Sequence, residues 1–172
     1  ILSSGTSAIL LNGVPGKVFH CKRGVRQGDP LSPLLFVLAA DLLQSILNKA
    51  KEMNLLKLPI MQDCGSDFPI IQYADDTLLI LEACPIQLFT LKALLQTFAD
   101  STGLKVNYSK SNIYPINVSQ EKMVILSNTL NCQIGQMPFT YLGLPMGSDR
   151  PKMENFMPLV HKIERRLTCT SL

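Results

Sequence analysis

The chain has 172 residues, 47% hydrophobic and 17% charged, which excludes a disordered tail and is typical of one globular domain. Its formal net charge of +3 permits a nucleic-acid partner without requiring one. The longest apolar run, LLFVLAA at 34–40, is far shorter than the roughly 20 residues that span a bilayer, so the sequence predicts no transmembrane helix and no membrane partner.

The first predicted element is a hairpin within residues 7–22. Apolar runs stand on both sides of Asn12-Gly13, a pair that favours a tight two-residue turn between antiparallel strands. A loop rich in glycine and proline, RGVRQGDPLSP at 23–33, comes next. It separates the hairpin from a long apolar segment.

That segment predicts a helix that begins near Ser32 and Pro33 and ends at about Lys51. Serine favours the N-cap and proline the first helical position. The helix is apolar nearly all round at 34–40, which predicts a central, buried helix. Asp41 interrupts this apolar surface, and we interpret it as a capping or hydrogen-bonding residue rather than a metal ligand.

Two further apolar runs form the segment IIQYADDTLLIL at 70–81 and meet at Asp75 and Asp76. Each run is suited to a buried strand, so the segment predicts a hairpin. Apolar residues at helical spacing then predict a helix that Gly103 ends in the left-handed conformation; the stripe comprises Leu88, Leu91, Leu94, Leu95 and Phe98.

The remaining chain predicts alternating strands and helices. The expected elements are a strand at 104–108, a helix at 119–130, a strand, Gly-Pro turn and second strand at 139–147, and an amphipathic helix at 152–167. No repeat or linker interrupts them. The sequence therefore predicts a single α+β domain.

The adjacent carboxylates of Asp75 and Asp76 have two readings. If the strand pattern continues through them, Tyr73 and Asp75 share a face, and both carboxylates reach a common point where they repel unless a cation lies between them. Mg²⁺ prefers one or two carboxylates together with phosphate oxygens and water. Aspartate is also common in turns, so a polar two-residue turn is the alternative explanation, and spacing alone does not decide between the two.

Several motifs in order resemble the reverse transcriptase family, in particular the enzymes of non-LTR, LINE-type retrotransposons. They are RGVRQGDPLSPLLF at 23–36, YADD at 73–76, STGLKVNYSKS at 101–111, YLGLPMG at 141–147 and PLVHKIERRLTCTSL at 158–172. YADD alone is a weak signal, but these motifs together in this order are specific. The resemblance covers nearly the whole chain.

The resemblance implies roles for the matching residues. Asp75 corresponds to a metal-binding aspartate, with Asp76 beside it in a weaker or structural role, and the implied ion is Mg²⁺, with Mn²⁺ as a substitute. The other implied roles are phosphate binding by Arg26, contacts to nucleotide and template by Gln27 and Gly28, contact with the primer-template end by Tyr73, protonation of the leaving pyrophosphate by Lys110, and a primer grip formed by Tyr141, Leu142 and Gly143.

Plainer explanations exist for some of these residues and their neighbours. Asp29 and Pro30 fit a role in shaping the turn before the helix, and Lys110 fits an exposed turn lysine as well as it fits a general acid. His20 and His161 have no neighbours in sequence that suggest catalysis. We interpret both histidines as ordinary surface or packing residues.

The resemblance implies a partial polymerase palm: an antiparallel sheet with the YADD hairpin packed on helices, and the start of a thumb at 148–172. The family has a further catalytic aspartate upstream of the RQGDP loop, but the 25 residues before Arg26 contain no acidic residue. We therefore expect a fragment that lacks this strand and the fingers. We also expect it to be inactive alone and, with apolar surface and a sheet edge exposed, prone to aggregation.

Three functions remain open at this point. The first is part of an RNA-directed DNA polymerase, whose partners are an RNA template, a DNA primer and deoxynucleoside triphosphates. The second is a non-catalytic nucleic-acid-binding or interaction remnant of a retroelement, and the third, a magnesium phosphohydrolase, leaves the RQGDPLSP loop unexplained. Five cysteines without CxxC spacing indicate reduced thiols, and thus a nuclear or cytoplasmic setting.

Overall fold

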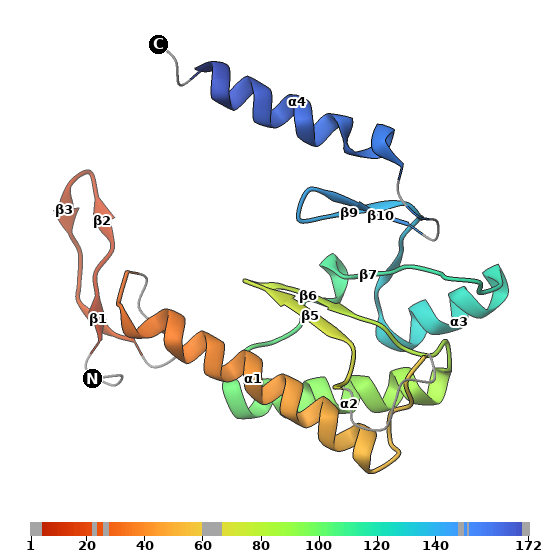
Figure 1. Cartoon of the computed structure of the whole chain (residues 1–172). Helices are drawn as coiled ribbons and strands as arrows, with labels where there is room; N and C mark the ends of the chain where they lie inside the picture. Colours follow the sequence, from red (N-terminus) through yellow and green to blue (C-terminus); the bar gives the residue numbers. More distant parts are fainter. Residues whose placement is uncertain are drawn as a thin grey trace. The chain divides into compact units, whose positions relative to one another are not determined.

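A computed structural model describes residues 5–21, 24–25, 28–59, 67–147, 150 and 152–169 (Figure 1). Contacts divide the chain into two compact units, Ile1–Val106 and Asn107–Leu172, and each is described by itself. Both units combine helices with short strand pairs, of which four are antiparallel and one is parallel in the described ranges. The chain therefore has the α+β composition that the sequence predicts.

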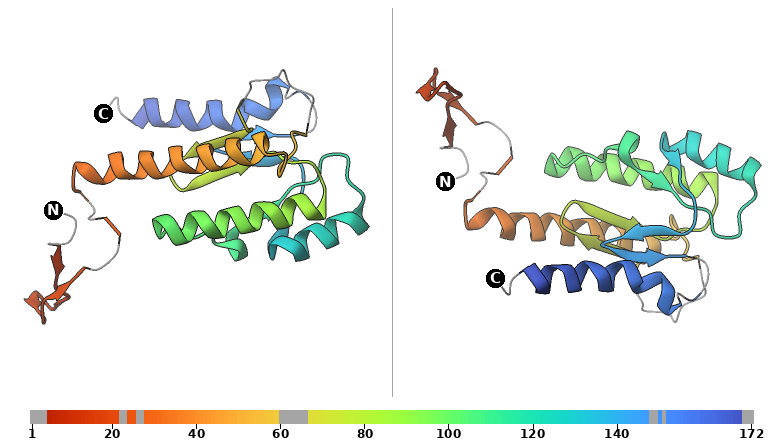
Figure 2. Two further views of the ribbon diagram at one scale, coloured as in Figure 1. Left: turned by 90° about the horizontal axis from the view of Figure 1, so that it is seen from below. Right: turned by 90° about the horizontal axis from the view of Figure 1, so that it is seen from above.

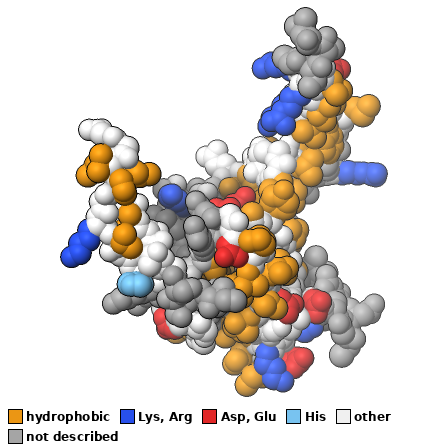
Figure 3. All heavy atoms as spheres, turned by 90° about the vertical axis from the view of Figure 1, so that its left-hand side faces the viewer, with side chains coloured by type: hydrophobic (Ala, Val, Ile, Leu, Met, Phe, Trp, Pro, Cys, Tyr) orange, Lys and Arg blue, Asp and Glu red, His pale blue; other side chains and the backbone are white. Residues whose placement is uncertain are grey.

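The first unit begins with residues 5–21, which we call the N-terminal arm. Its strands are β1 (Thr6–Ser7), β2 (Leu10–Leu11), β3 (Val14–Pro15) and β4 (Phe19–His20), with β2 paired to β3 and β1 to β4. Asn12 and Gly13 close the inner pair with φ of 49° and 81°, as a type I′ turn requires. The predicted hairpin is thus confirmed, although its apolar side chains are exposed (Figure 3).

Helix α1 spans Leu31–Glu52. Its N-cap is Pro30, and the Asp29 carboxylate accepts a hydrogen bond from the Leu31 N–H at 2.9 Å. The prediction of Ser32 at the N-cap is therefore wrong by two residues, because the Asp29 carboxylate satisfies the N–H of Leu31, the first residue of the helix. Asp29 and Pro30 therefore shape the turn at the start of the helix, as expected from the sequence.

Only the second half of α1 is buried, so the prediction of a central, buried helix is half right. Leu43, Leu47 and Ala50 are buried, whereas Leu34 and Leu38 are 61% and 65% exposed. Within the described ranges, α1 is the one helix long and apolar enough to cross a membrane. A core helix of a soluble protein passes the same test, so the length and composition of α1 decide nothing about a membrane.

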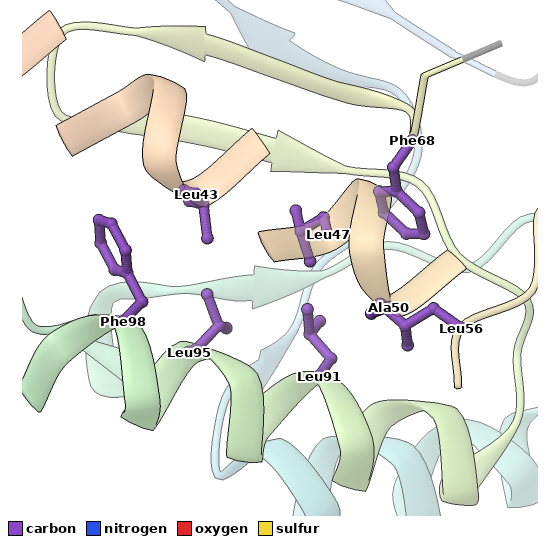
Figure 4. Close-up of a cluster of buried hydrophobic side chains, with 8 residues drawn as sticks. All are labelled: Leu43, Leu47, Ala50, Leu56, Phe68, Leu91, Leu95 and Phe98. Atoms are coloured by element: carbon purple, nitrogen blue, oxygen red, sulfur yellow. The ribbon is translucent and has the colours of Figure 1, made fainter. Parts of the chain in front are cut away.

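Helix α2 spans Pro85–Thr102, with proline at its first position and Gly103 as its left-handed cap, at φ 79°. These features confirm the predicted helix. Figure 4 shows how α1 and α2 face each other across the main core, which Phe68 joins from the segment before β5. The buried residues of this core are Leu43, Leu47, Ala50, Leu56, Phe68, Leu91, Leu95 and Phe98.

The second unit consists of η1 (Tyr108–Lys110), β7 (Asn112–Ile113), α3 (Gln120–Leu130), β8 (Gln133–Ile134), β9 (Phe139–Tyr141), β10 (Leu144–Met146) and α4 (Met153–Cys169). The helices at 119–130 and 152–167 are confirmed. The strand predicted at 104–108 is wrong: 104–107 has no regular structure, and the 3₁₀ turn η1 follows. Local hydrogen bonds that the Asn107 side-chain oxygen accepts from the Ser109 hydroxyl and the Lys110 N–H favour that turn over an extended strand.

Strands β7 and β8 pair in parallel, with α3 as the connection between them. The Gly135 N–H donates to the Ile113 carbonyl at 2.9 Å. A Cβ added at Gly135 would overlap the ring of Tyr114, which stacks on Phe139 with ring centroids 3.9 Å apart. Only glycine therefore fits between this strand and the stacked rings.

Candidate functional site

The two aspartates lie at the tip of a hairpin formed by β5 (Ile70–Tyr73) and β6 (Asp76–Leu79). Tyr73 pairs with Asp76, so Ala74 and Asp75 form a two-residue turn. The sequence predicts this hairpin correctly. Ala74 has φ 50°, a value that costs an L-residue other than glycine roughly 1–2 kcal/mol, so the tip is held in a strained conformation.

The turn changes which side chains share a face. Asp75 is in the turn rather than in a strand, so the expected strand alternation from Tyr73 to Asp75 does not hold. Instead Tyr73 and Asp76 stand opposite each other and lie on one face. Tyr73, Asp75 and Asp76 are all exposed, and neither carboxylate forms a hydrogen bond or ion pair with any described residue. Both carboxylates are available to a ligand.

An open cavity of about 450 Å³ lies between α1 and the hairpin, which run side by side (Figure 2). Its polar lining comes from Asp41, Gln44 and Gln72. Phe36, Val37, Ala40 and Ala74 supply the apolar part of the lining. The strained turn residue Ala74 therefore borders the same space as the polar side chains of α1.

Sequence reasoning gave Asp41 a capping or hydrogen-bonding role and did not single out Gln44 or Gln72. Asp41 is exposed and has no hydrogen bond to the described residues, so that role is not supported. A signal was present: Asp41, Gln44 and Asn48 follow helical spacing and form a polar stripe on an otherwise apolar helix.

The loop before α1 is described only in part. Arg26 and Gln27 lie outside the described residues. Gly28 has φ 82°, and a Cβ there would meet no atom within 4 Å. Gly28 is therefore required for its backbone conformation and not for lack of space.

Lys110 belongs to the second unit, where it ends η1. Its backbone N–H donates to the Asn107 side-chain oxygen at 3.3 Å, and its side chain is exposed, without an ion pair to the described residues. Burial raises the pKa of the neighbouring Tyr108 phenol above its usual value. Lys110 thus has the surroundings of an exposed turn lysine, with its ammonium group free to meet a ligand.

Tyr141, Leu142 and Gly143 form the tip of a second hairpin, β9–β10. Tyr141 pairs with Leu144, and the turn residues Leu142 and Gly143 have φ of 51° and 83°. The predicted Gly-Pro turn is therefore displaced, because Pro145 lies within β10. The Tyr141 hydroxyl is buried without a hydrogen-bond partner among the described residues, an arrangement that is costly unless a further group meets it.

The structure thus places six of the predicted site residues at two hairpin tips. Tyr73, Asp75 and Asp76 share one tip in the first unit, and Tyr141, Leu142 and Gly143 share another in the second. Across the described ranges, no group of three or more His, Cys, Asp or Glu side chains is arranged to hold a metal ion. At the YADD tip, the described part of the chain offers two carboxylates.

A family model described as reverse transcriptase (RNA-dependent DNA polymerase) matches residues 3–146. The chain belongs to the reverse transcriptase family. Members of this family use divalent metal ions and act on a nucleic-acid template and primer. The match includes both the loop before α1 and the YADD hairpin.

Two relatives are similar to the chain over most of its length. The reverse transcriptase chain is 32% identical over 111 residues to an uncharacterized mitochondrial protein of Arabidopsis thaliana, covering 61% of the chain and 85% of that protein. It is 33% identical over 112 residues to the retrovirus-related Pol polyprotein of the type-1 retrotransposable element R2 from Popillia japonica. That match covers 64% of the chain and 15% of the polyprotein, so the chain matches a small part of the longer protein.

Proposed function

We propose that the chain supplies the palm of an RNA-directed DNA polymerase, which extends a primer 3′ hydroxyl with deoxynucleotides. One observation supports this above all: Asp75 and Asp76 stand exposed at a strained hairpin tip, without partners among the described residues, in a chain of the reverse transcriptase family. Residues 148–172 lead from this palm into a thumb. A remnant that only binds nucleic acid is the alternative.

The tip suits a divalent cation. Two adjacent carboxylates match the preference of Mg²⁺ for carboxylate, phosphate and water oxygens, so Asp75 and Asp76 are the residues that would hold it, with Mn²⁺ as a substitute. The ion supplies charge neutralisation and orientation of phosphate oxygens when bound. The described part of the chain has no third acidic group at this point, so a further carboxylate is required for a two-metal site.

The other candidate residues act on the substrates. Tyr73 meets the primer-template end from the strand beside Asp76, and Gly28 with Gln27 lines the nucleotide and template. Arg26 binds phosphate through its planar guanidinium group. In the second unit, Lys110 donates a proton to the leaving pyrophosphate, and the β9–β10 tip at Tyr141, Leu142 and Gly143 grips the primer.

The polypeptide of 172 residues is inactive by itself under this proposal, because its two tip carboxylates do not complete a two-metal site. A primer-extension assay with RNA template, DNA primer, deoxynucleotides and Mg²⁺ tests this. We expect no product. Extension by the purified chain that Asp75→Asn abolishes would show that the chain is active alone.

A chimera tests the catalytic role directly. In it, the matching stretch of the R2 Pol polyprotein from Popillia japonica is replaced by the corresponding stretch of this chain. We expect primer extension by the chimera, a loss of at least 100-fold with Asp75→Asn because a metal ligand is removed, and a smaller loss with Asp76→Asn. Asp100→Asn, which changes an exposed carboxylate on α2, is the matched control and should leave extension unchanged.

The alternative predicts a different result for the same chimera. A folded chimera that binds template and primer but does not extend the primer, under conditions where the unmodified R2 polyprotein does, would favour a non-catalytic remnant. Equal activity of the chimera and its Asp75→Asn variant would exclude Asp75 as a metal ligand.

A further inference from the structure

We infer that Gln44 and Asn48 of α1 are positioning residues, which fix strand β5 against the helix and so set where Asp75 and Asp76 lie relative to α1. With Asp67 and Phe68 they form what we call the α1–β5 clamp. The inference rests on the proposed function for the role of the aspartates. The clamp itself is defined by hydrogen bonds that do not depend on a metal ion.

The clamp holds the backbone of Phe68 from both sides. The Phe68 N–H donates to the Asn48 side-chain oxygen at 2.8 Å, and the Phe68 carbonyl accepts from the Gln44 amide nitrogen at 3.1 Å. The same Gln44 amide donates to Asn48 at 3.0 Å. Asn48 also donates to the Asp67 carboxylate at 2.8 Å, so four residues form one connected hydrogen-bond network.

The side chain of Phe68 adds a third point of attachment. It is 1% exposed and packs in the core with Leu47 of α1, which is fully buried. A residue held through its N–H, its carbonyl and its ring is fixed in position and in orientation. Since Phe68 lies two residues before β5 begins at Ile70, the orientation of the whole strand follows from it.

The far end of β5 meets α1 again at the cavity. Gln72 and Ala74 line it together with Asp41 and Gln44, so Gln44 belongs to both the clamp and the cavity wall. A strand rises about 3.3 Å per residue and alternates its faces, so a rotation at Phe68 would carry the tip away from the helix. The clamp is thus placed to determine the geometry at the Ala74–Asp75 turn.

Nuclear magnetic resonance tests the clamp without a metal ion. In the labelled full chain we expect Overhauser contacts between the methyl groups of Ala74 and those of Val37 and Ala40, which line one cavity. Asn48→Ala together with Gln44→Ala should abolish these contacts and speed amide exchange in β5 and β6 by at least tenfold. Contacts that persist unchanged in this double variant would overturn the inference.

Two controls separate positioning from general stability. Gln96→Ala removes an exposed amide that donates to Asp100 at 2.8 Å on α2 and should keep the Ala74 contacts. Leu95→Val weakens the core of the same unit and should lower the melting temperature while also keeping them. Loss of the contacts in Leu95→Val would mean that the clamp variants report instability and would overturn the inference.

An exchange of side chains provides a rescue. Asn48→Asp alone leaves acceptors for Phe68 and Gln44 but sets a carboxylate against Asp67, so the Ala74 contacts should weaken. Combining it with Asp67→Asn restores a donor opposite the carboxylate, so the contacts should return. A double variant no better than Asn48→Asp alone would count against the network.

Mn²⁺ then connects the clamp to the proposed function. In the wild-type chain we expect paramagnetic broadening at 74–77 and at the cavity-lining residues of α1, and in the clamp variants broadening at 74–77 alone. Absence of broadening at the tip in the wild type would refute the proposed metal site. The clamp would then be tested by the Overhauser contacts alone. Broadening of α1 that is equal in wild type and clamp variants would overturn the positioning role.

Discussion

The β2–β3 and β5–β6 hairpins are both closed by two-residue turns but are stabilised in different ways. Asn12 and Gly13 adopt positive φ at little cost, yet Leu10 and Leu11 beside them are 67% and 71% exposed. The stability of the first hairpin therefore comes mainly from its turn. The turn residues specify the hairpin, and its exposed apolar side chains add little buried surface.

In the second hairpin, the turn is unfavourable and the buried packing is favourable. Ala74 at its tip is unsuited to φ 50°, but Ile70 and Leu79 pack against the buried core and Phe68 is inside it. Tertiary contacts therefore impose a turn that its own residues disfavour. Strain of this kind is common at functional sites, and here it occurs beside Asp75 and Asp76, which have no partner among the described residues.

The largest effect should come from removing the core beneath the second hairpin. Phe68→Ala should lower the free energy of unfolding by about 3–5 kcal/mol, because it leaves a cavity where a ring was fully packed. Urea denaturation measures it, and amide exchange should be fastest in β5 and β6. Leu10→Ala in the N-terminal arm is the control, with an expected change within about 0.5 kcal/mol. Equal losses in the two variants would contradict the contrast between the hairpins.

Mg²⁺ should stabilise only the hairpin with the carboxylate tip. At ten times its dissociation constant, a bound ion adds about 1.4 kcal/mol to the free energy of unfolding, and a chelator should remove the gain. Asp75→Asn with Asp76→Asn should abolish the response, whereas Asp100→Asn on α2 should preserve it. A response that survives the double substitution would place the ion elsewhere.

Relieving the strain at the tip should have a smaller effect. Ala74→Gly should stabilise the chain by about 0.5–1 kcal/mol, since glycine adopts positive φ freely but loses more entropy on folding. The matched change Asn12→Gly should alter stability by only a few tenths of a kcal/mol. Thermal unfolding of both variants measures the difference. A destabilised Ala74→Gly variant would show that the turn is not strained.

The smallest effect is expected at the third hairpin, β9–β10, which combines the two types of turn residue. Leu142 at φ 51° is unfavourable and Gly143 at φ 83° is favourable. Leu142→Asn should therefore stabilise the second unit by about 0.5 kcal/mol, because asparagine tolerates the left-handed region. Gly143→Ala should have the opposite sign, and differential scanning calorimetry distinguishes the two.

The sequence predicts best those elements whose signals are local. The Asn12-Gly13 hairpin, the Gly103 cap and the YADD hairpin all formed where their residues indicate. The errors have competing local causes. The Asp29 carboxylate accepts a hydrogen bond from Leu31, so α1 begins earlier than predicted. The Asn107 side chain accepts hydrogen bonds that favour the 3₁₀ turn η1 where a strand was expected.

The sequence indicated which residues lie at the hairpin tip but not the geometry around them. Asp75 and Asp76 stand at a hairpin tip as expected, while the positive φ of Ala74, the cavity beside Asp41 and the hydrogen bonds of Asn48 to Asp67 and Phe68 depend on contacts that no sequence pattern fixes. Side chains far apart in sequence meet there only after α1 and β5 have packed.

The fit of Gly135 beneath the stacked rings of Tyr114 and Phe139 bears on how such a gene decays. Any substitution at Gly135 disturbs packing, whereas under the proposed function Asp75→Asn removes a metal ligand and leaves packing intact. Among related sequences, drift at Gly135 together with Asp75 would mark loss of the protein altogether. Drift at Asp75 with Gly135 retained would mark a lineage in which the fold is kept without the proposed polymerase chemistry.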